Sequence, residues 1–481
     1  MKKTCTLLVL SSGLLMPSAW AQAPQPEPTT DMPMTPSIAP VAPPIDDTAQ
    51  RPFFLTLSEA ITVAETNNHD IKLALERIKD ARLQVTETGA QGLPQITATA
   101  GYGRQDPVLS QQSTDTSGAG GAGLGNNPQF AAFLGTASVN TFNSSITMNQ
   151  MLFAGFRIID GIRLGQINVD LQQQALRQTR QNVAFQVANA YFNALRAYEV
   201  VASDKQALLQ AREQVRLAEV RLRAGTGIKL DLLQAQSQEI QVQQRLSLDL
   251  SAYEKAKMSL NQVIGRETLH PLELNPHATV ANYAVDAKAG LLTALENRAD
   301  LRQFRLQREM AELNATIQGR AVWPTISAQV RYNLQDSAVV DGNNRSVQNM
   351  NYGLNMNWPI FDGFAAQAKS QRAQQQALQA QISEDQLQQR VILDIEQALL
   401  DIREALEREQ MARAGVELAN ESLRVARISY REGAGIMLNV INSQLSVQQA
   451  DTSLITARFD LNTRKARLYQ ALGLDLHDFL R

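Results

Sequence analysis

Residue types that usually carry catalysis or bind metals are few and scattered in this sequence. It contains four histidines: His69, His270, His277 and His477. None of them has a partner at metal-ligand spacing, so each is expected at the surface or in a turn. The glycine-rich stretch Gly118–Gly125 lacks the Lys-Ser/Thr pair that completes a phosphate-binding loop. The sequence therefore predicts no enzyme, no metal site and no cofactor.

The N-terminus has the pattern of a secretory signal peptide. Met1-Lys2-Lys3 precedes the apolar run Leu7–Leu15, and cleavage is expected after Ala21. The only cysteine, Cys5, lies inside this segment, so the mature chain has no disulfide and no thiolate ligand. Two of the 45 basic residues also lie there, which leaves 43 against 47 acidic residues and gives no reason to expect nucleic acid.

The stretch Asn349–Ile360 alternates apolar and polar residues. Its apolar members are Met350, Tyr352, Leu354, Met356, Trp358 and Ile360. Such alternation predicts a strand with one apolar face, and about a dozen residues suffice for a tilted strand to cross a bilayer. A half-buried strand of an ordinary sheet is the alternative for one isolated stretch. Similar alternation occurs at 95–103, 142–152 and 325–334. Since no later apolar run reaches the roughly 18 residues of a spanning helix, any membrane crossing is expected to be by strands.

Long helical patterns separate these strands. They cover about 57–91, 158–223, 229–263, 291–320, 365–431 and the segment that ends near Leu472. The two longest helices, of roughly 65 residues, would each span about 100 Å, which is too long for an ordinary globular core. Val391, Ile395, Ala398 and Ile402 recur at the spacing of a coiled-coil seam. A long structural coiled coil would explain the helices but not the strands.

The same order of elements occurs twice, so the chain is an internal duplication. Leu152–Phe156 matches Ile360–Phe364 at an offset of 208 residues, and Arg223–Gly227 matches Arg431–Gly435 at the same offset. Leu93-Pro94 matches Trp323-Pro324 at an offset of 230, because the loop of the first hairpin is 22 residues longer. The predicted domains are a signal peptide (1–21), a Pro-rich flexible leader (22–52), a first repeat (53–268), an equatorial linker (269–290), a second repeat (291–474) and a short tail (475–481). The repeats contain β-hairpins at 95–153 and 325–361 and tip turns at 225–227 and 433–435.

Four strands cannot close a membrane barrel by themselves. Closure takes at least about eight strands, and open sheet edges are not tolerated in lipid. Several chains must therefore pool their strands. A dimer would supply eight strands with a filled interior, and a trimer would supply twelve with room for a lumen. These physical arguments leave the choice between dimer and trimer open.

The ordered set of motifs resembles the TolC-like outer membrane efflux and type I secretion channels. The resemblance covers Leu57 to about Leu474 and rests on the duplication, the helix-to-strand prolines Pro94 and Pro324, the strand exits with Gly155 and Gly363, and the two glycine tips. It implies a homotrimer in the outer membrane, with a twelve-stranded transmembrane β-barrel that continues into a twelve-helix periplasmic α-barrel. It also implies contact with outer-membrane lipid, a periplasmic membrane-fusion adaptor and an inner-membrane transporter of RND or ABC type.

Two further sets of residues take expected roles from the resemblance. The adaptor is expected to dock on the helix-turn-helix tips, at Gly225, Thr226, Gly227, Leu230, Asp231, Gly433, Ala434, Gly435 and Leu438. The periplasmic gate is expected at Asp231, Tyr430, Asn439 and Asn442. The glycines also have a simpler use, because a tight turn between two helices needs them, and Tyr430 could serve coiled-coil packing alone.

The gate departs from the family pattern in two ways. Tyr430 and Asp231 fall on the positions of one latch, but Gly435 and Leu230 fall on the positions of a second latch, which is therefore absent. The family's ring aspartates fall on Asn439 and Asn442. We therefore expect a gate with one latch fewer and with weaker selection for cations, because a neutral ring attracts cations less than an acidic one.

The sequence thus predicts an outer-membrane exit duct for a tripartite exporter, passive in itself and driven by the pump. It does not distinguish export of drugs from secretion of polypeptides. A structural or adhesive outer-membrane stalk is the alternative from another class, although a stalk needs neither docking turns nor polar inner strand faces. A simple diffusion porin would not need so long a helical tube.

Overall fold

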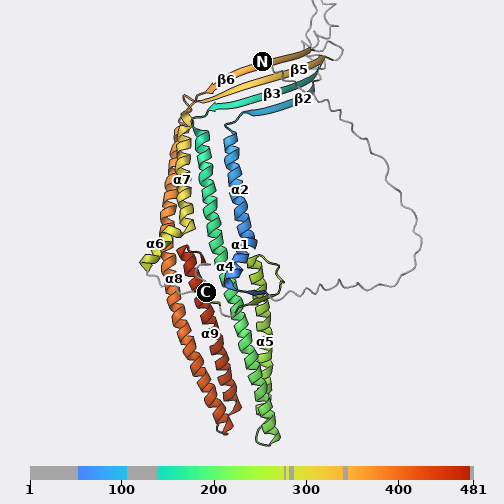
Figure 1. Cartoon of the computed structure of the whole chain (residues 1–481), viewed down its shortest axis with the longest axis vertical. Helices are drawn as coiled ribbons and strands as arrows, with labels where there is room; N and C mark the ends of the chain where they lie inside the picture. Colours follow the sequence, from blue (N-terminus) through green and yellow to red (C-terminus); the bar gives the residue numbers. More distant parts are fainter. Residues whose placement is uncertain (1–52, 106–138, 276–277, 281–286, 340–344, 477–481) are drawn as a thin grey trace, which may run out of the picture. The chain divides into compact units, whose positions relative to one another are not determined.

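The computed structural model describes residues 53–105, 139–275, 278–280, 287–339 and 345–476 (Figure 1). All of them belong to one compact unit, Pro52–Arg481. The predicted signal peptide and leader, the loops of the two long hairpins and the end of the predicted tail lie outside the described residues.

The two halves repeat one order of elements. The first half contains β1 (Phe53–Leu55), α1 (Leu57–Asn67), α2 (His69–Ala90), β2 (Gln95–Gln105), β3 (Val139–Phe153), α4 (Arg157–Arg223) and α5 (Lys229–Ile264). The second half contains β4 (Leu272–Leu274), α6 (Ala287–Asn297), α7 (Ala299–Gly319), the 3-10 turn η1 (Arg320–Val322), β5 (Thr325–Val339), β6 (Arg345–Asn357), α8 (Ala365–Arg431) and α9 (Met437–Leu472). The predicted strand at 349–360 ends at Asn357 instead, because Pro359 has no backbone N–H to donate to a sheet.

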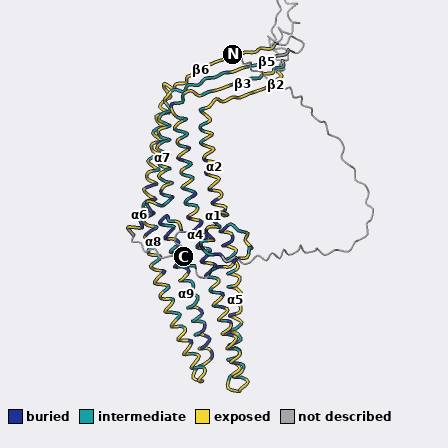
Figure 2. Tube along the Cα trace, viewed as in Figure 1, coloured by how far each residue is buried: buried dark blue, intermediate teal, exposed yellow. Residues whose placement is uncertain are grey.

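The four long strands form one antiparallel sheet in the order β2-β3-β5-β6. The central pair, β3 and β5, joins the two halves, with Ile146 opposite Tyr332. β2 and β6 are the edges of the sheet within this chain. Apolar side chains on both edges, such as Tyr102 and Leu354, are exposed, and much of the sheet is exposed along its length (Figure 2). The isolated sheet thus has the open edges and uncovered apolar face that the sequence predicts.

α4 and α8, of 67 residues each, run from the sheet to the far tips (Figure 1). Near the sheet α4 packs against α2 and α7, and α8 packs against α7. Toward the tips α4 packs against α5 and α9, and α8 packs against α9. None of the helices among the described residues combines the length and the hydrophobicity needed to cross a membrane.

The main hydrophobic core lies where the short and long helices meet. Here β1 pairs with β4 in parallel, a small sheet that the prediction of an irregular linker at 269–290 missed. The buried Tyr191 donates its hydroxyl to the carbonyl oxygens of Leu55 (2.9 Å) and Asn275 (3.1 Å). Burial raises the pKa of Tyr191 to about 12, so the phenol stays protonated and keeps both hydrogen bonds. These bonds fix the ends of both short strands against α4.

Two helices predicted as continuous are each interrupted by one extended residue. The helix predicted at 57–91 is broken at Asn68, whose side chain accepts from the backbone N–H of Asp70 (2.8 Å) and donates to the Val263 carbonyl (2.8 Å). The helix predicted at 291–320 is broken at Arg298, the repeat equivalent of Asn68. A glycine backbone packs against each break, since a Cβ on Gly265 or Gly473 would lie within 2.8 Å of backbone atoms there. The breaks therefore let the ends of α5 and α9 approach.

Candidate functional site

The two helical tips are tight turns with the same hydrogen bonds. In the first tip, the N–H groups of Thr226 and Gly227 donate to the Arg221 carbonyl at 2.9 and 3.0 Å. In the second tip, Ala434 and Gly435 donate to the Ser429 carbonyl at the same distances. Gly225 and Gly433 have φ values of 75° and 77°, the left-handed region that favours glycine. The backbone conformation of the turns is therefore sufficient to explain Gly225 and Gly433, without any role in binding.

One side of each tip is open. Apart from the adjacent residues of the turn, no atom of the described chain would lie within 4 Å of a Cβ on Gly225 or Gly433. Leu230 and Leu438, both predicted to dock a partner, are exposed, whereas Met437 is buried in a small apolar cluster behind the tips. The tips thus present an apolar and unobstructed surface to solvent.

The predicted latch residues lie together. The Tyr430 hydroxyl donates to Asp231 Oδ2 at 3.0 Å, which joins α8 to α5. Partial burial raises the pKa of Tyr430, and the nearby Asp231 raises it further, so the hydroxyl is a proton donor at neutral pH. Gly435 and Leu230, at the positions where the family pattern predicts a second latch, carry no polar side chain.

Arg221 completes this contact, and the sequence analysis did not identify it. Its guanidinium carbon lies 4.6 Å from the centroid of the Tyr430 ring, in cation–π geometry. The same group donates to the carbonyl oxygens of Tyr430 and Arg431, both at 3.3 Å. Repeat symmetry gives no signal for it, because Ser429 occupies the equivalent position of the second half.

The predicted ring residues Asn439 and Asn442 are exposed and lie three residues apart on α9. Ser422 and Ser443 are in mutual contact at 3.4 Å and line a shallow depression with Asn439. Glu421 also borders the depression, but it is paired with Arg424 on its own helix. This part of the tip surface thus combines polar and apolar side chains, and its one carboxylate is paired with an arginine.

A row of polar contacts joins α4 to α9 between the Tyr430–Asp231 contact and the main hydrophobic core. Gln214 donates to Gln444, and Gln448 donates to Asp204 Oδ1 at 2.7 Å, all with buried side chains. Gln444 also donates to Gln210 at 3.2 Å. Periodicity cannot reveal such contacts, because buried amides on a Gln-rich helix look like exposed ones in the sequence.

The two strand-to-helix turns, at 154–156 and 362–364, have the same backbone conformation but different neighbours. Gly155 and Phe156 both have positive φ, as do Gly363 and Phe364. In the first turn the Phe156 ring packs edge-on against Trp323, and the Arg320 guanidinium lies 5.6 Å from its centroid. In the second turn Phe364 meets only Phe361 among the described aromatic rings, and it remains 68% exposed.

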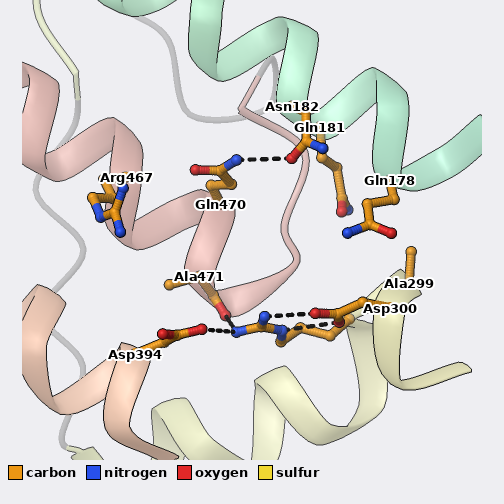
Figure 3. A pocket seen from close by; sticks show the side chains of 10 residues that line it. Gln178, Gln181, Asn182, Ala299, Asp300, Asp394, Arg467, Gln470 and Ala471 are labelled. Atoms are coloured by element: carbon orange, nitrogen blue, oxygen red, sulfur yellow. Dashed lines mark hydrogen bonds and ion pairs between the residues drawn. The ribbon is translucent and has the colours of Figure 1, made fainter. Parts of the chain in front are cut away.

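A polar cluster fastens the break at Arg298 to three helices (Figure 3). The Arg298 guanidinium pairs with Asp300 (2.6 Å) and Asp394 (3.2 Å) and donates to the Ala471 carbonyl (3.3 Å). It borders a cavity of about 240 Å³ lined mainly by amides and charged groups. Since the guanidinium already has two carboxylate partners, the cluster serves as a structural joint. No group of three or more potential metal-ligating side chains occurs among the described residues.

Comparison with known proteins gives a consistent result. The family model described as "Outer membrane efflux protein" matches residues 60–266 and 291–474, one segment in each repeat. The outer membrane efflux protein BepC of Brucella suis is 24% identical over 89% of this chain and 87% of its own length. The pyoverdine export outer membrane protein OpmQ of Pseudomonas putida is 23% identical over 87% of this chain and 85% of its own length. The crystal structure of the Campylobacter jejuni CmeC outer membrane channel superposes with a TM-score of 0.69 at 16% identity and covers 87% of this chain and 85% of CmeC.

Proposed function

The chain belongs to the outer membrane efflux protein family, and we propose on this premise that it is the outer-membrane exit duct of a tripartite export system. The observation that carries the proposal is a duplicated protomer whose strands form an open sheet and whose long helices end in two exposed tips. A periplasmic adaptor and an inner-membrane transporter would deliver cargo, and the duct would conduct it passively through its lumen. Drugs, small molecules and secreted polypeptides all fit this function.

Three copies would close the structure. The edges β2 and β6 leave backbone hydrogen-bonding groups without partners inside the chain, which lipid does not tolerate. Pairing β6 of one copy with β2 of the next turns three four-stranded sheets into a barrel of twelve strands. The exposed apolar side chains of β6, including Tyr352 and Leu354, would then face outer-membrane lipid.

Repeat symmetry predicts the register of this new strand pair. Within the chain, β3 and β5 pair with Ile146 opposite Tyr332. The repeat offsets carry these two positions onto Leu354 of β6 and Tyr102 of β2. The same shift places Met356 opposite Ala100, so apolar residues meet apolar residues. An independent check agrees, because the two hairpins obey the same offsets, with Gln95 opposite Asn149 and Thr325 opposite Asn357.

Cysteine cross-linking tests the trimer and its register together. Directly opposed strand residues have Cβ atoms about 4.5–5.5 Å apart, close to disulfide geometry. Leu354→Cys with Tyr102→Cys should yield a covalent trimer on oxidation, against a background without thiols in the predicted mature chain. Leu354→Cys with Ala98→Cys is the matched control, since its register is displaced by four residues. Cross-linking of the control pair alone would refute the register.

The tips would receive the adaptor. Their open glycine faces and exposed leucines form a surface on which another backbone can approach closely. Leu230→Asp combined with Leu438→Asp should abolish export in cells and in vitro binding of the adaptor, while trimer formation stays unchanged. Leu269→Asp is the control, because Leu269 is also exposed but lies far from the tips in the sequence. Normal export by the tip variant would contradict docking there.

Tyr430, Asp231 and Arg221 would hold the periplasmic end closed. Single-channel conductance of the purified trimer in planar bilayers tests both the duct and its gate. A small, flickering conductance that rises several-fold in Tyr430→Phe would support the proposal, because only the hydroxyl that reaches Asp231 is lost. A protein that inserts as a folded trimer but conducts nothing would favour a structural stalk.

The neutral Asn439 and Asn442 predict weak cation selectivity. Asn439→Asp with Asn442→Asp should increase the permeability ratio of K⁺ to Cl⁻ and make it depend on pH, because three copies would add six carboxylates to the constriction. Reversal-potential measurements in a salt gradient give this ratio. Strong, titratable cation selectivity already in the unaltered protein would contradict the prediction.

A further inference from the structure

Asp204 is an acidic side chain buried between the two coiled coils. It lies on α4, about 30 Å from the tip turn at a rise of 1.5 Å per residue. Its side chain is 1% exposed. Oδ1 accepts a hydrogen bond from Gln448 of α9, but the buried Oδ2 has no donor among the described residues. A buried carboxylate oxygen without a donor is costly, so the arrangement needs an explanation.

A second carboxylate faces Asp204. Arg245 Nε of α5 lies 3.7 Å from Asp204 Oδ1 and also 3.7 Å from Asp249 Oδ2, so one guanidinium serves two carboxylates at the limit of ion-pair distance. Two ionised carboxylates repel each other, and one arginine at this distance compensates them only in part. A proton on Asp204 would remove this repulsion, and it would leave a neutral carboxyl where the charged Oδ2 lacks a donor. The geometry therefore favours binding of one proton.

The electrostatics of the cluster point in the same direction. The pKa of Asp204 is raised to about 6, chiefly because the carboxyl is buried. The neighbouring Asp249 contributes to this rise, whereas Gln448 and Arg245 lower the pKa. From α5 the charged groups that face Asp204 are thus Asp249 and Arg245, and α9 faces it with the neutral Gln448. The next acidic residue of α9, Asp451, has its pKa raised by its own burial alone.

The cluster occurs in one half of the chain only. The repeat equivalents of Asp204, Arg245 and Asp249 are Ala412, Ser453 and Ala457, and Gln448 corresponds to Ile240. The titratable contact therefore joins α4 and α5 to α9 within one protomer. The equivalent positions on α8, α9 and α5 carry apolar or neutral side chains, so they cannot form a second titratable contact.

We propose that Asp204 binds a proton in mildly acidic medium, and that the neutral carboxyl, with its hydrogen bond from Gln448, is a clasp that holds α9 against α4 and α5. The clasp joins the same two coiled coils as the contact between Tyr430 and Asp231, so it opposes any movement that separates them. Its effect on gating rests on the proposed function, whereas the clasp itself does not.

The sign of the pH effect follows from linkage. When α9 is packed against α4 and α5, which we call the docked state, the pKa of Asp204 is about 6. When α9 moves away and water reaches the carboxyl, the pKa returns to its ordinary value of 3.8. The docked state binds the proton more tightly, so its added stability is complete below pH 3.8 and is lost as the pH rises through about 6. Between pH 7.5 and pH 5.0 the ratio of closed to open channels should rise by up to about tenfold for each of the three clasps that must open.

Thermal unfolding of the full-length trimer in detergent tests the clasp without reference to conduction. The unaltered protein should gain more stability between pH 7.5 and pH 5.0 than Asp204→Asn, whose amide is always neutral. Ala412→Asn, at the repeat equivalent of Asp204, is the control and should retain the gain of the unaltered protein, because it introduces the same amide without removing a carboxyl. If Asp204→Asn does not fold, Asp249→Asn should lower the midpoint of the pH effect. An equal pH effect in Asp204→Asn, or an unshifted midpoint in Asp249→Asn, would overturn the proposal.

Single-channel recording then tests the link to the gate. Open probability should fall in the unaltered protein from pH 7.5 to pH 5.0, and it should change less than twofold in Asp204→Asn. The same fall in both proteins would overturn the gating effect. Absence of conductance at every pH would instead refute the duct, while the unfolding experiment would still decide whether the clasp exists.

Discussion

The two strand-to-helix turns have one backbone conformation and two environments. Phe156 packs against Trp323 and Arg320 of its own chain and is 48% exposed, while the equivalent Phe364 lacks these neighbours and is 68% exposed. The repeat offsets identify what is missing at the second turn, since Trp323 and Arg320 correspond to Leu93 and Ala90 of the first half. In one chain those residues lie at the opposite edge of the sheet, on the β2 side. We therefore expect Phe364 to lie near Leu93 and Ala90 of a neighbouring copy, so that the contact at this turn is made once within a chain and once between chains.

The two turns should differ most in their response to an added methyl group. A Cβ on Gly155 would lie 2.9 Å from Trp323 Cβ, in a backbone with φ of 59°, so Gly155→Ala should cost about 2–4 kcal/mol. Gly363→Ala meets no neighbour among the described residues of its chain, and the equivalent of Trp323 is the smaller Leu93, so it should cost about 1 kcal/mol for its left-handed backbone. Circular dichroism melting in detergent measures both, and equal losses would contradict the asymmetry.

The next largest loss of stability is expected when the hydroxyl of Tyr191 is removed. Leu399 occupies the equivalent position in the second half. Tyr191→Phe leaves the carbonyls of Leu55 and Asn275 without their donor and should cost about 1–3 kcal/mol. Because the folded-state pKa is raised to about 12, this contribution should be constant up to about pH 10 and disappear as the pH rises through 12. Urea unfolding across this range tests it, with the half-exposed Tyr198→Phe as control.

The smallest effect should come from building the missing ion pair at the contact between copies. Arg320 pairs with Asp160 in the first turn, and the equivalents are Ala90 and Ala368. Ala90→Arg combined with Ala368→Asp should stabilise the trimer by up to about 1 kcal/mol per contact, and less in high salt. The dissociation temperature of the trimer in mild SDS measures the gain. A gain from either single variant equal to that of the pair would show that no new ion pair has formed.

Sequence reasoning recovered the elements whose boundaries are local. Glycines set the tip turns, and Pro94 and Pro324 precede strands that begin at the next residue. It missed the breaks at Asn68 and Arg298, because one extended residue barely disturbs the helical spacing on either side. What selects the break at Asn68 is a hydrogen bond to Val263, 195 residues away in the sequence.

The candidate site divides in the same way. Tyr430 and Asp231 followed from the family pattern, and their side chains do meet. Arg221 and Asp204 did not follow from it, because each acts through contacts with the other half of the chain and neither has a repeat equivalent of similar chemistry. Single-chain periodicity carries no information on such pairs.

The helix lengths have a consequence for how this chain can change over evolution. α4 and α8 have 67 residues each, and α5 and α9 have 36 each. Losing seven residues from α4 alone would place the two tips at levels about 10 Å apart. The distance from the sheet to the tips is therefore set by two helices of equal length, α4 and α8. An insertion or deletion in one of them must be matched by an equal change in the other. The sheet's hairpin loops carry no such constraint, and it is there that the two halves have diverged by 22 residues.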